Sequence, residues 1–255
     1  MVDIHSHILS AVDDGARNLD ESLEMCRRSA DDGITTIVAT PHAHDSVHKT
    51  HAPEFLRQKV DELNSLLKGA PRIELGCELR FTHEVVKQVC QDQSAPTIAG
   101  GPYVLVEFPH RILPPGSERA LFELMGYQIR PIIAHPERNQ MIIAEPERFF
   151  PLVEMGVLGQ ADSGSFTGQF GKAVQQTATV LLEHGLVHCL ASDCHNTRNR
   201  LPGLSEAVAA VAHLAGHDFA GAMAGANPAA IVRGERIPYQ PPALYPKKRK
   251  KWLFF

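Results

Sequence analysis

Side chains that can bind metal ions recur along this sequence, each just after a short apolar run. The first run, Met1–His7, carries His5 and His7. Side chains at positions i and i+2 of a strand lie on one face, so both imidazoles can reach one ion. The full candidate set is His5, His7, Asp14, His42, Glu78, Glu107, His135, Asp193 and His195. Packing gives no reason for such residues to recur at the ends of apolar runs, so we predict a shared site.

Nine ligands are more than one ion needs, so we predict a cluster of two or three divalent ions. The expected groups are His5, His7, Glu78 and Asp193; Glu78, Glu107 and His135; and Asp14, His42 and His195. Imidazole and carboxylate donors without a thiolate favour Mn²⁺, Fe or Zn²⁺. Clustered cations lower the pKa of bound water and hold the oxygens of an in-line displacement. The pattern therefore indicates phosphoester hydrolysis by a metal-bound hydroxide.

Phosphate chemistry also calls for arginines, because the planar guanidinium matches two phosphate oxygens at once. Arg138 lies three residues after His135, and Arg200 lies five residues after His195. We predict that both contact the phosphate, with Arg17 as a weaker third candidate. The other nine histidines are assigned no role; they are His44, His48, His51, His83, His110, His184, His188, His213 and His217.

The apolar runs alternate with helical patterns. The predicted strands are Met1–His7, Thr36–Thr40, Ile73–Cys77, Val104–Phe108, Pro131–Ala134, Val157–Gln160 and Val187–Ala191. The predicted helices run from Asn18 or Asp20 to Asp32, then over Pro53–Leu67, Glu118–Met125, Pro146–Met155, Gly168–His184 and Leu204–Leu214. This alternation predicts parallel strands joined by helices. About seven such units indicate a barrel, in which the carboxyl ends of the strands collect the catalytic residues.

Composition limits the other possibilities. A chain of 255 residues with 44% hydrophobic content suits one domain, which we place at residues 1–238. The net charge of −4 gives no basic surface overall for nucleic acid. Five cysteines without a CxxC pair argue against a disulfide framework and favour a reducing cytoplasm. Polar residues in Met1–His7 leave no room for a signal peptide, and no apolar run approaches the ~20 residues of a membrane span.

Residues 239–255 differ from the rest and are predicted to form a tail, rich in proline at first and then basic and aromatic. Lys247–Lys251 contributes five positive charges, and removing these from the net charge of −4 leaves −9 on the remaining chain. Four apolar residues follow, Trp252–Phe255. This tail suits peripheral contact with anionic lipid at the inner face of the membrane. A solvated end explains it equally well at this point.

Several segments resemble the polymerase-and-histidinol-phosphatase (PHP) superfamily. They are MVDIHSHILSAVDDGARNLDES, TPHAHD, GCELRF, LVEF, IIAHPER and SDCHN. Within it, IHSHxxxxxDDG and AHPER resemble the bacterial manganese-dependent protein-tyrosine phosphatases of capsular and exopolysaccharide clusters. The resemblance runs from residue 2 to about Arg233 and implies a distorted (β/α)7 barrel whose metal set matches the nine residues above. It implies one arginine where TRNR offers Arg198 and Arg200, so the assignment of Arg200 is less firm than that of Arg138.

The resemblance further implies a substrate, phosphotyrosine on an autophosphorylated bacterial tyrosine kinase that controls polysaccharide synthesis. Three alternatives stay open: a phosphatase for small monoesters such as histidinol phosphate, a regulator that binds the kinase without catalysis, and a cysteine-dependent phosphatase. The last alternative rests on Cys194 and Arg200, which fit the pattern C-x₅-R. It is disfavoured because no glycine lies between them to help cradle a phosphate, and because strand alternation turns Cys194 away from its neighbours.

Overall fold

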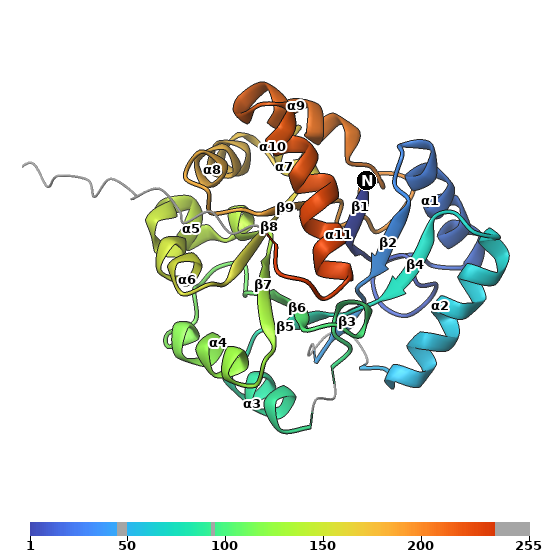
Figure 1. Cartoon of the computed structure of the whole chain (residues 1–255), viewed down its shortest axis with the longest axis horizontal. Helices are drawn as coiled ribbons and strands as arrows, with labels where there is room; N and C mark the ends of the chain where they lie inside the picture. Colours follow the sequence, from blue (N-terminus) through green and yellow to red (C-terminus); the bar gives the residue numbers. More distant parts are fainter. Residues whose placement is uncertain (45–49, 93–94, 238–255) are drawn as a thin grey trace, which may run out of the picture.

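A computed structural model describes residues 1–44, 50–92 and 95–237 of the chain. Its strands lie at the centre and its helices surround them (Figure 1). The strands are β1 (Val2–Ser6), β2 (Thr36–Ala39), β3 (His42–Ala43), β4 (Arg72–Leu75), β5 (Glu78–Arg80), β6 (Tyr103–Glu107), β7 (Arg130–Ala134), β8 (Leu158–Asp162) and β9 (Cys189–Ala191). Every pair of neighbouring strands in this part of the chain is parallel, as predicted.

Two strand positions are interrupted, which divides the strands into two sheets. One sheet has the order β1-β2-β4, and the other has the order β3-β5-β6-β7-β8-β9. The backbone continues across the gap, because Gly76 N donates to Ala39 O at 2.8 Å and Glu78 N donates to Pro41 O at 3.1 Å. Since β3 extends β2 and β5 extends β4, the described strands occupy seven positions, in agreement with the predicted number of units.

The first and last positions meet through a short contact instead of a full ladder. Ser6 and Cys194 form an isolated parallel bridge. His7 N donates to Cys194 O, and Asp193 N donates to His5 O, both at 2.9 Å. The α/β fold class is therefore confirmed. The described strands form two parallel sheets joined by this bridge, and the distorted barrel stays a prediction.

Alternation along the strands separates an inner face from an outer one. In β6, Val104 and Val106 pack in the outer cluster against the helices, whereas Tyr103 and Leu105 pack in a second, inner cluster. Side chains two residues apart share a face. Leu105 therefore has Glu107 beyond it on the inner face, at the carboxyl end of β6. The same alternation in β8 leads from the buried Leu158 to Gln160 and Asp162.

The helices that surround the strands are mostly short. Their bounds are α1 (Leu19–Asp31), α2 (Pro53–Leu67), α3 (His83–Asp92), α4 (Ser117–Gly126), α5 (Gln140–Ala144), α6 (Phe150–Glu154), α7 (Ser163–Phe166), α8 (Lys172–Glu183), α9 (Ser205–Ala215), α10 (His217–Gly221) and α11 (Asn227–Val232). Asn18 begins α1, because its side-chain oxygen accepts from Glu21 N at 2.9 Å and so satisfies a free N–H of the first turn. Asp20, the other predicted cap, lies inside the helix.

Two predicted helices have different bounds in the structure. The prediction for Pro146–Met155 becomes a 3₁₀ turn, Pro146–Phe149, followed by α6. The prediction for Gly168–His184 begins too early, because α8 starts at Lys172. Gly168 and Gly171 have φ of +83° and +88°, which ends the helical path and forms a separate turn.

The predicted division at residue 238 stays a prediction, because Tyr239–Phe255 lies outside the described residues. His48, to which no role was assigned, also lies outside them. Within residues 1–44, 50–92 and 95–237, no helix combines the length and the apolar character that crossing a bilayer requires.

Candidate metal centre

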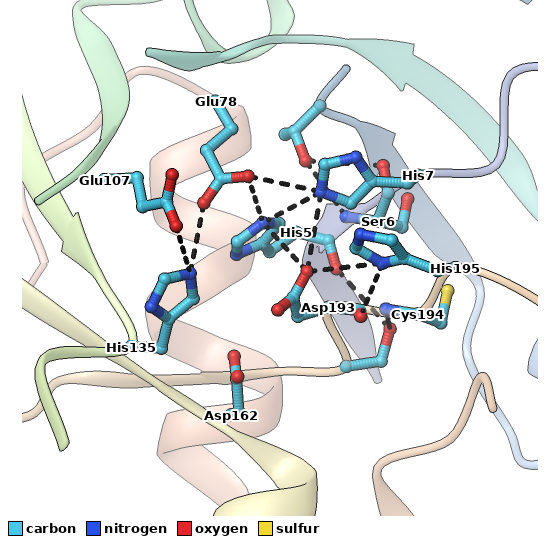
Figure 2. Close-up of polar contacts among 12 residues, drawn as sticks. His5, Ser6, His7, Glu78, Glu107, His135, Asp162, Asp193, Cys194 and His195 are labelled. Atoms are coloured by element: carbon cyan, nitrogen blue, oxygen red, sulfur yellow. Dashed lines mark hydrogen bonds and ion pairs between the residues drawn. The ribbon is translucent and has the colours of Figure 1, made fainter. Parts of the chain in front are cut away.

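The Glu78 carboxylate lies at the centre of the predicted ligands and is 1% exposed. Its Oε2 lies 3.3 Å from His5 Nε2, from His7 Nε2 and from His42 Nδ1, and its Oε1 lies 3.1 Å from His135 Nε2. Figure 2 shows the Glu78 carboxylate between the rings of His5, His7 and His135. The sequence predicted that Glu78 follows the third strand. In the structure it is instead the first residue of β5, directly after the interruption.

A second gathering of ligand atoms lies toward solvent. Asp14 Oδ1 lies 3.3 Å from His195 Nε2 and 3.5 Å from His42 Nε2. Ligand atoms of His7, Asp14, His42 and His195 all lie within 4.8 Å of one another. The Asp14 side chain is 45% exposed, so this group marks the open side of the cluster. The predicted group of Asp14, His42 and His195 is thus brought together, with His7 added to it.

The remaining ligands complete three further groups within the same 4.8 Å limit. These groups are His5, His7 and Asp193; His5, Glu78 and His135; and His42, Glu78 and Glu107. All nine predicted residues therefore converge. Their role as metal ligands stays a prediction, which the geometry below supports.

The orientations of His5 and His7 fit bound cations. His7 Nδ1 lies 2.7 Å from Asp13 Oδ2, and His5 Nδ1 lies 2.9 Å from Gln160 Oε1. Each acceptor places the ring proton on Nδ1, which leaves the Nε2 lone pairs directed inward. The two Nε2 atoms are 3.3 Å apart. In neutral rings these two lone pairs would repel each other unless a cation, either a proton or a metal ion, lies near both, so the local chemistry suits a metal site.

Asp193 supports the same interpretation. Its Oδ1 lies 3.2 Å from His5 Nε2, 3.4 Å from His7 Nε2 and 3.6 Å from His195 Nδ1. Despite these neighbours, this buried oxygen accepts no hydrogen bond from the described residues. Buried oxygens are normally satisfied. An oxygen that is close to three imidazoles but aligned with none of them suits coordination of an ion.

The pKa shifts of His5 and Glu78 also indicate that the site needs positive charge. Burial alone lowers the pKa of His5, but the Glu78 and Asp193 carboxylates outweigh it and raise this pKa to about 9. For Glu78, burial raises the pKa, yet His5 and the other imidazoles hold it well below its usual range. Protons on the imidazoles thus balance the buried carboxylates, and bound cations would replace those protons.

The two predicted arginines meet at Asp193. Arg138 Nη1 donates to Asp193 Oδ2 at 2.6 Å and to Asp162 Oδ2 at 2.7 Å. Arg200 Nη2 also donates to Asp193 Oδ2, and its Nη1 lies 2.8 Å from His195 Nε2. Both guanidinium groups therefore border the cluster, as predicted. Arg17 does not; it is exposed and pairs with Glu21 at 2.9 Å.

Cys194 is unsuited to nucleophilic catalysis. Its side chain is 1% exposed and packs in an apolar cluster with Ile8 and Leu204. Burial raises the pKa of the Cys194 thiol well above its usual range, whereas catalysis by cysteine requires the thiolate. The C-x₅-R pattern is therefore not accompanied by the environment of a cysteine-dependent phosphatase.

Four supporting residues were not predicted from the sequence, namely Asp13, Arg80, Gln160 and Asp162. Arg80 pairs with Glu107, and Gln160 Nε2 donates to Asp162 Oδ1 at 3.0 Å. The sequence offered a partial signal for two of them, because Asp13 precedes a predicted ligand and Gln160 ends a predicted strand. Of the histidines without an assigned role, His110 reaches the edge of the site, with its Nε2 3.7 Å from Glu107 Oε1.

The chain is similar to proteins of known family and activity. Residues 1–233 match the family described as "Capsular polysaccharide synthesis, CpsB/CapC". The chain is 37% identical to the tyrosine-protein phosphatase YwqE of Bacillus subtilis, over the full length of both proteins. It is 30% identical to the tyrosine-protein phosphatase CpsB of Streptococcus pneumoniae, covering 93% of this chain and 100% of that protein.

A solved structure is also similar. It comes from a study of YwqE from Bacillus subtilis and CpsB from Streptococcus pneumoniae, described as "unique metal-dependent tyrosine phosphatases". The TM-score is 0.90 at 35% identity, and the match covers 95% of this chain and 98% of that one. A β-aspartyl dipeptidase from Fervidobacterium islandicum shares only the fold, with a TM-score of 0.54 at 15% identity.

The support of His5 by Gln160 gives a first prediction. In Gln160→Leu, the acceptor for His5 Nδ1 is lost, so the ring can turn or change its tautomer. We expect Mn²⁺ affinity, measured by calorimetric titration of metal-free protein, to fall about 10- to 100-fold. The metal-free unfolding temperatures of variant and wild type are compared as a control. Equal Mn²⁺ affinity in the two proteins would show that Gln160 does not orient His5.

The burial of Cys194 gives a second prediction. Cys194→Ser should keep most phosphatase activity, because the thiol is buried in an apolar cluster that raises its pKa and disfavours the nucleophilic thiolate. Asp193→Ala, one residue away, should lose nearly all activity. Initial rates and bound metal are measured for both variants. A Cys194→Ser protein that keeps its metal but is inactive would restore the cysteine mechanism.

Proposed function

The chain belongs to the CpsB/CapC family of capsular polysaccharide synthesis proteins, and we propose that it hydrolyses phosphotyrosine on a protein as a metal-dependent tyrosine phosphatase. The family resemblance drawn from the sequence is thereby confirmed. The observation that carries the proposal is the convergence of nine imidazole and carboxylate side chains on a buried site bordered by two arginines. Its named relatives are tyrosine-protein phosphatases.

Cations bound in this cluster would supply a more acidic water molecule and neutralise charge on the phosphate. The residues of the chain have separate tasks. Asp13 and Gln160 hold the His7 and His5 rings with Nε2 directed inward. Arg138 and Arg200 orient the phosphate, because their guanidinium groups present fixed pairs of donors. The phenol released from phosphotyrosine has a pKa of about 10, so its oxygen departs with little help from an acid.

Manganese is the metal that we propose for this site, in a cluster of two or three ions. The donor set of imidazole and carboxylate, without thiolate, supports a choice among Mn²⁺, Fe and Zn²⁺. The four overlapping groups, which share His5, His7, His42 and Glu78, support more than one ion, because a shared carboxylate can bridge two cations.

The proposed substrate is the autophosphorylated tail of a bacterial tyrosine kinase that controls polysaccharide synthesis. The protein would then act in the cytoplasm, at the inner face of the membrane. The tail Lys247–Phe255 supports this location, because five basic residues followed by four apolar ones suit an anionic lipid surface.

The metal requirement gives a third prediction. After prolonged dialysis against chelator, hydrolysis of a phosphotyrosine peptide should be lost, and added Mn²⁺ should restore it, because the cluster holds the cations that the reaction needs. The rate on histidinol phosphate is measured in parallel. Full activity in excess chelator would contradict the metal mechanism. A higher kcat/KM for histidinol phosphate than for the peptide would favour a small-molecule phosphatase, and no turnover of either would favour a kinase-binding regulator.

The tail gives a fourth prediction. Deleting Lys247–Phe255 should leave the hydrolysis of a soluble phosphopeptide unchanged, because the predicted ligands all precede Asn196. Binding to vesicles that contain anionic lipid should fall in a sedimentation assay, since each basic residue near such a surface contributes about 1 kcal/mol. Added salt should weaken the binding of the full chain. Equal vesicle binding by the two proteins would exclude this role for the tail.

A further inference from the structure

The glycine turn that interrupts the predicted helix Gly168–His184 lies against the candidate site. The turn, Gly168–Gly171, connects α7 to α8. Gln169 N donates to Gly164 O at 2.9 Å, and Gly171 N donates to Gly168 O at 3.0 Å. The positive φ angles at its two glycines suit a tight reversal of this kind. Two backbone hydrogen bonds and two glycines thus define this turn.

Gly164 allows the turn to approach α7 closely. A Cβ atom at this position would lie 2.3 Å from Gln169 Oε1 and 2.9 Å from Phe170 Cε2. Both distances are shorter than atoms tolerate without moving. The side chains of Gln169 and Phe170 thus pack against Gly164 of α7, close to the carboxyl end of β8. They occupy the space that a larger side chain at position 164 would fill.

The Phe170 ring covers one face of Arg138. The Arg138 Cζ atom lies 4.6 Å from the ring centroid, a distance typical of a cation–π contact. Nη1 of Arg138 already donates to Asp162 and Asp193. Nε and Nη2 make no hydrogen bond with the described residues. Two carboxylates therefore hold Nη1, and the Phe170 ring covers one face of the guanidinium group. Nε and Nη2 can still donate to phosphate oxygens.

Gln169 contacts the loop that carries the other arginine. Its Nε2 donates to Asn199 O at 2.5 Å, one residue before Arg200. That loop is also held by Asn196, whose Oδ1 accepts from the backbone N–H groups of Asn199 at 2.9 Å and Arg200 at 3.3 Å. A single turn thus contacts both predicted phosphate-binding arginines, one through an aromatic ring and the other through the backbone of its loop.

We propose that Gln169 and Phe170 are positioning residues, which fix the spacing of Arg200 and Arg138 for a phosphate group. The proposal rests on the proposed function, because it takes these arginines as the phosphate contacts. Neither residue needs to touch the phosphate. Their effect comes from restricting the two guanidinium groups to one arrangement before the phosphate arrives, which lowers the entropy lost on binding.

The test measures binding of inorganic phosphate to Mn²⁺-loaded protein by calorimetry, which does not depend on turnover. Phe170→Leu should weaken phosphate binding about three- to tenfold, because the cation–π contact is lost. Phe170→Tyr, which keeps the ring, should bind phosphate within about twofold of wild type. In an Arg138→Ala background, Phe170→Leu should have no further effect. The matched control is Phe219→Leu, a half-buried phenylalanine of α10.

Gln169→Ala provides a second, independent variant in case Phe170→Leu fails to fold. It should weaken phosphate binding in the wild type but not in an Arg200→Ala background. The control is Gln175→Ala, which removes a neighbouring side-chain amide that donates, within the described part of the chain, to Phe166 O at 2.9 Å. Bound Mn²⁺ per chain should not change in any of these position 169 and 170 variants, because the nine ligands are untouched.

The outcomes separate this proposal from the proposed function. Unchanged phosphate binding in both Phe170→Leu and Gln169→Ala, or equal losses with and without the arginines, would overturn the positioning role. So would a wild type that binds Mn²⁺ but no phosphate. A wild type whose phosphate binding depends on Phe170, but which does not hydrolyse a phosphotyrosine peptide, would support the positioning role and contradict the proposed function.

Discussion

The site depends on one constraint, the burial of the Glu78 carboxylate among four imidazoles. An ionised carboxylate away from water costs several kcal/mol unless it is paired or coordinated. His5, His7, His42 and His135 satisfy this requirement from three strand positions, each at 3.1 to 3.3 Å, with His5 and His7 both contributed by β1 and the residue after it. The interruption between β4 and β5 lies directly before this carboxylate, so that Glu78 begins β5 beside His42 of β3.

A carboxylate at the centre also requires that its imidazole neighbours cannot turn. The structure meets this need with residues outside the nine ligands. Asp13 holds His7, and Gln160 holds His5 while its own amide is oriented by Asp162. Asp162 in turn accepts from Arg138, which the Phe170 ring covers. One chain of contacts therefore runs from an imidazole to an arginine, so that a predicted metal ligand and a predicted phosphate-binding arginine share their support.

The sequence predicted features that depend on local pattern. α2 has the predicted bounds Pro53–Leu67, and the ligands fall at strand ends because apolar runs and polar ends are visible in one dimension. Features that depend on distant partners were missed. His5 and Gln160 are 155 residues apart, and nothing near either residue indicates the other. Likewise, the run of residues 73–77 resembles one ordinary strand, and nothing in it indicates that β4 ends at Leu75 and that β5 begins at Glu78.

Asp193 joins the two halves of the site, because its oxygens have different partners. Oδ1 faces the imidazoles, whereas Oδ2 accepts from both Arg138 and Arg200. The backbone is unusual at two predicted ligands: Asp193 has φ of +48°, and His135, three residues before Arg138, has +33°. A left-handed conformation costs about 1 to 2 kcal/mol for a residue other than glycine. Arg138 follows His135 by three residues, and Arg200 follows Asp193 by seven. Two of the left-handed residues of the chain thus lie at strand ends that place a predicted ligand beside an arginine of the same site.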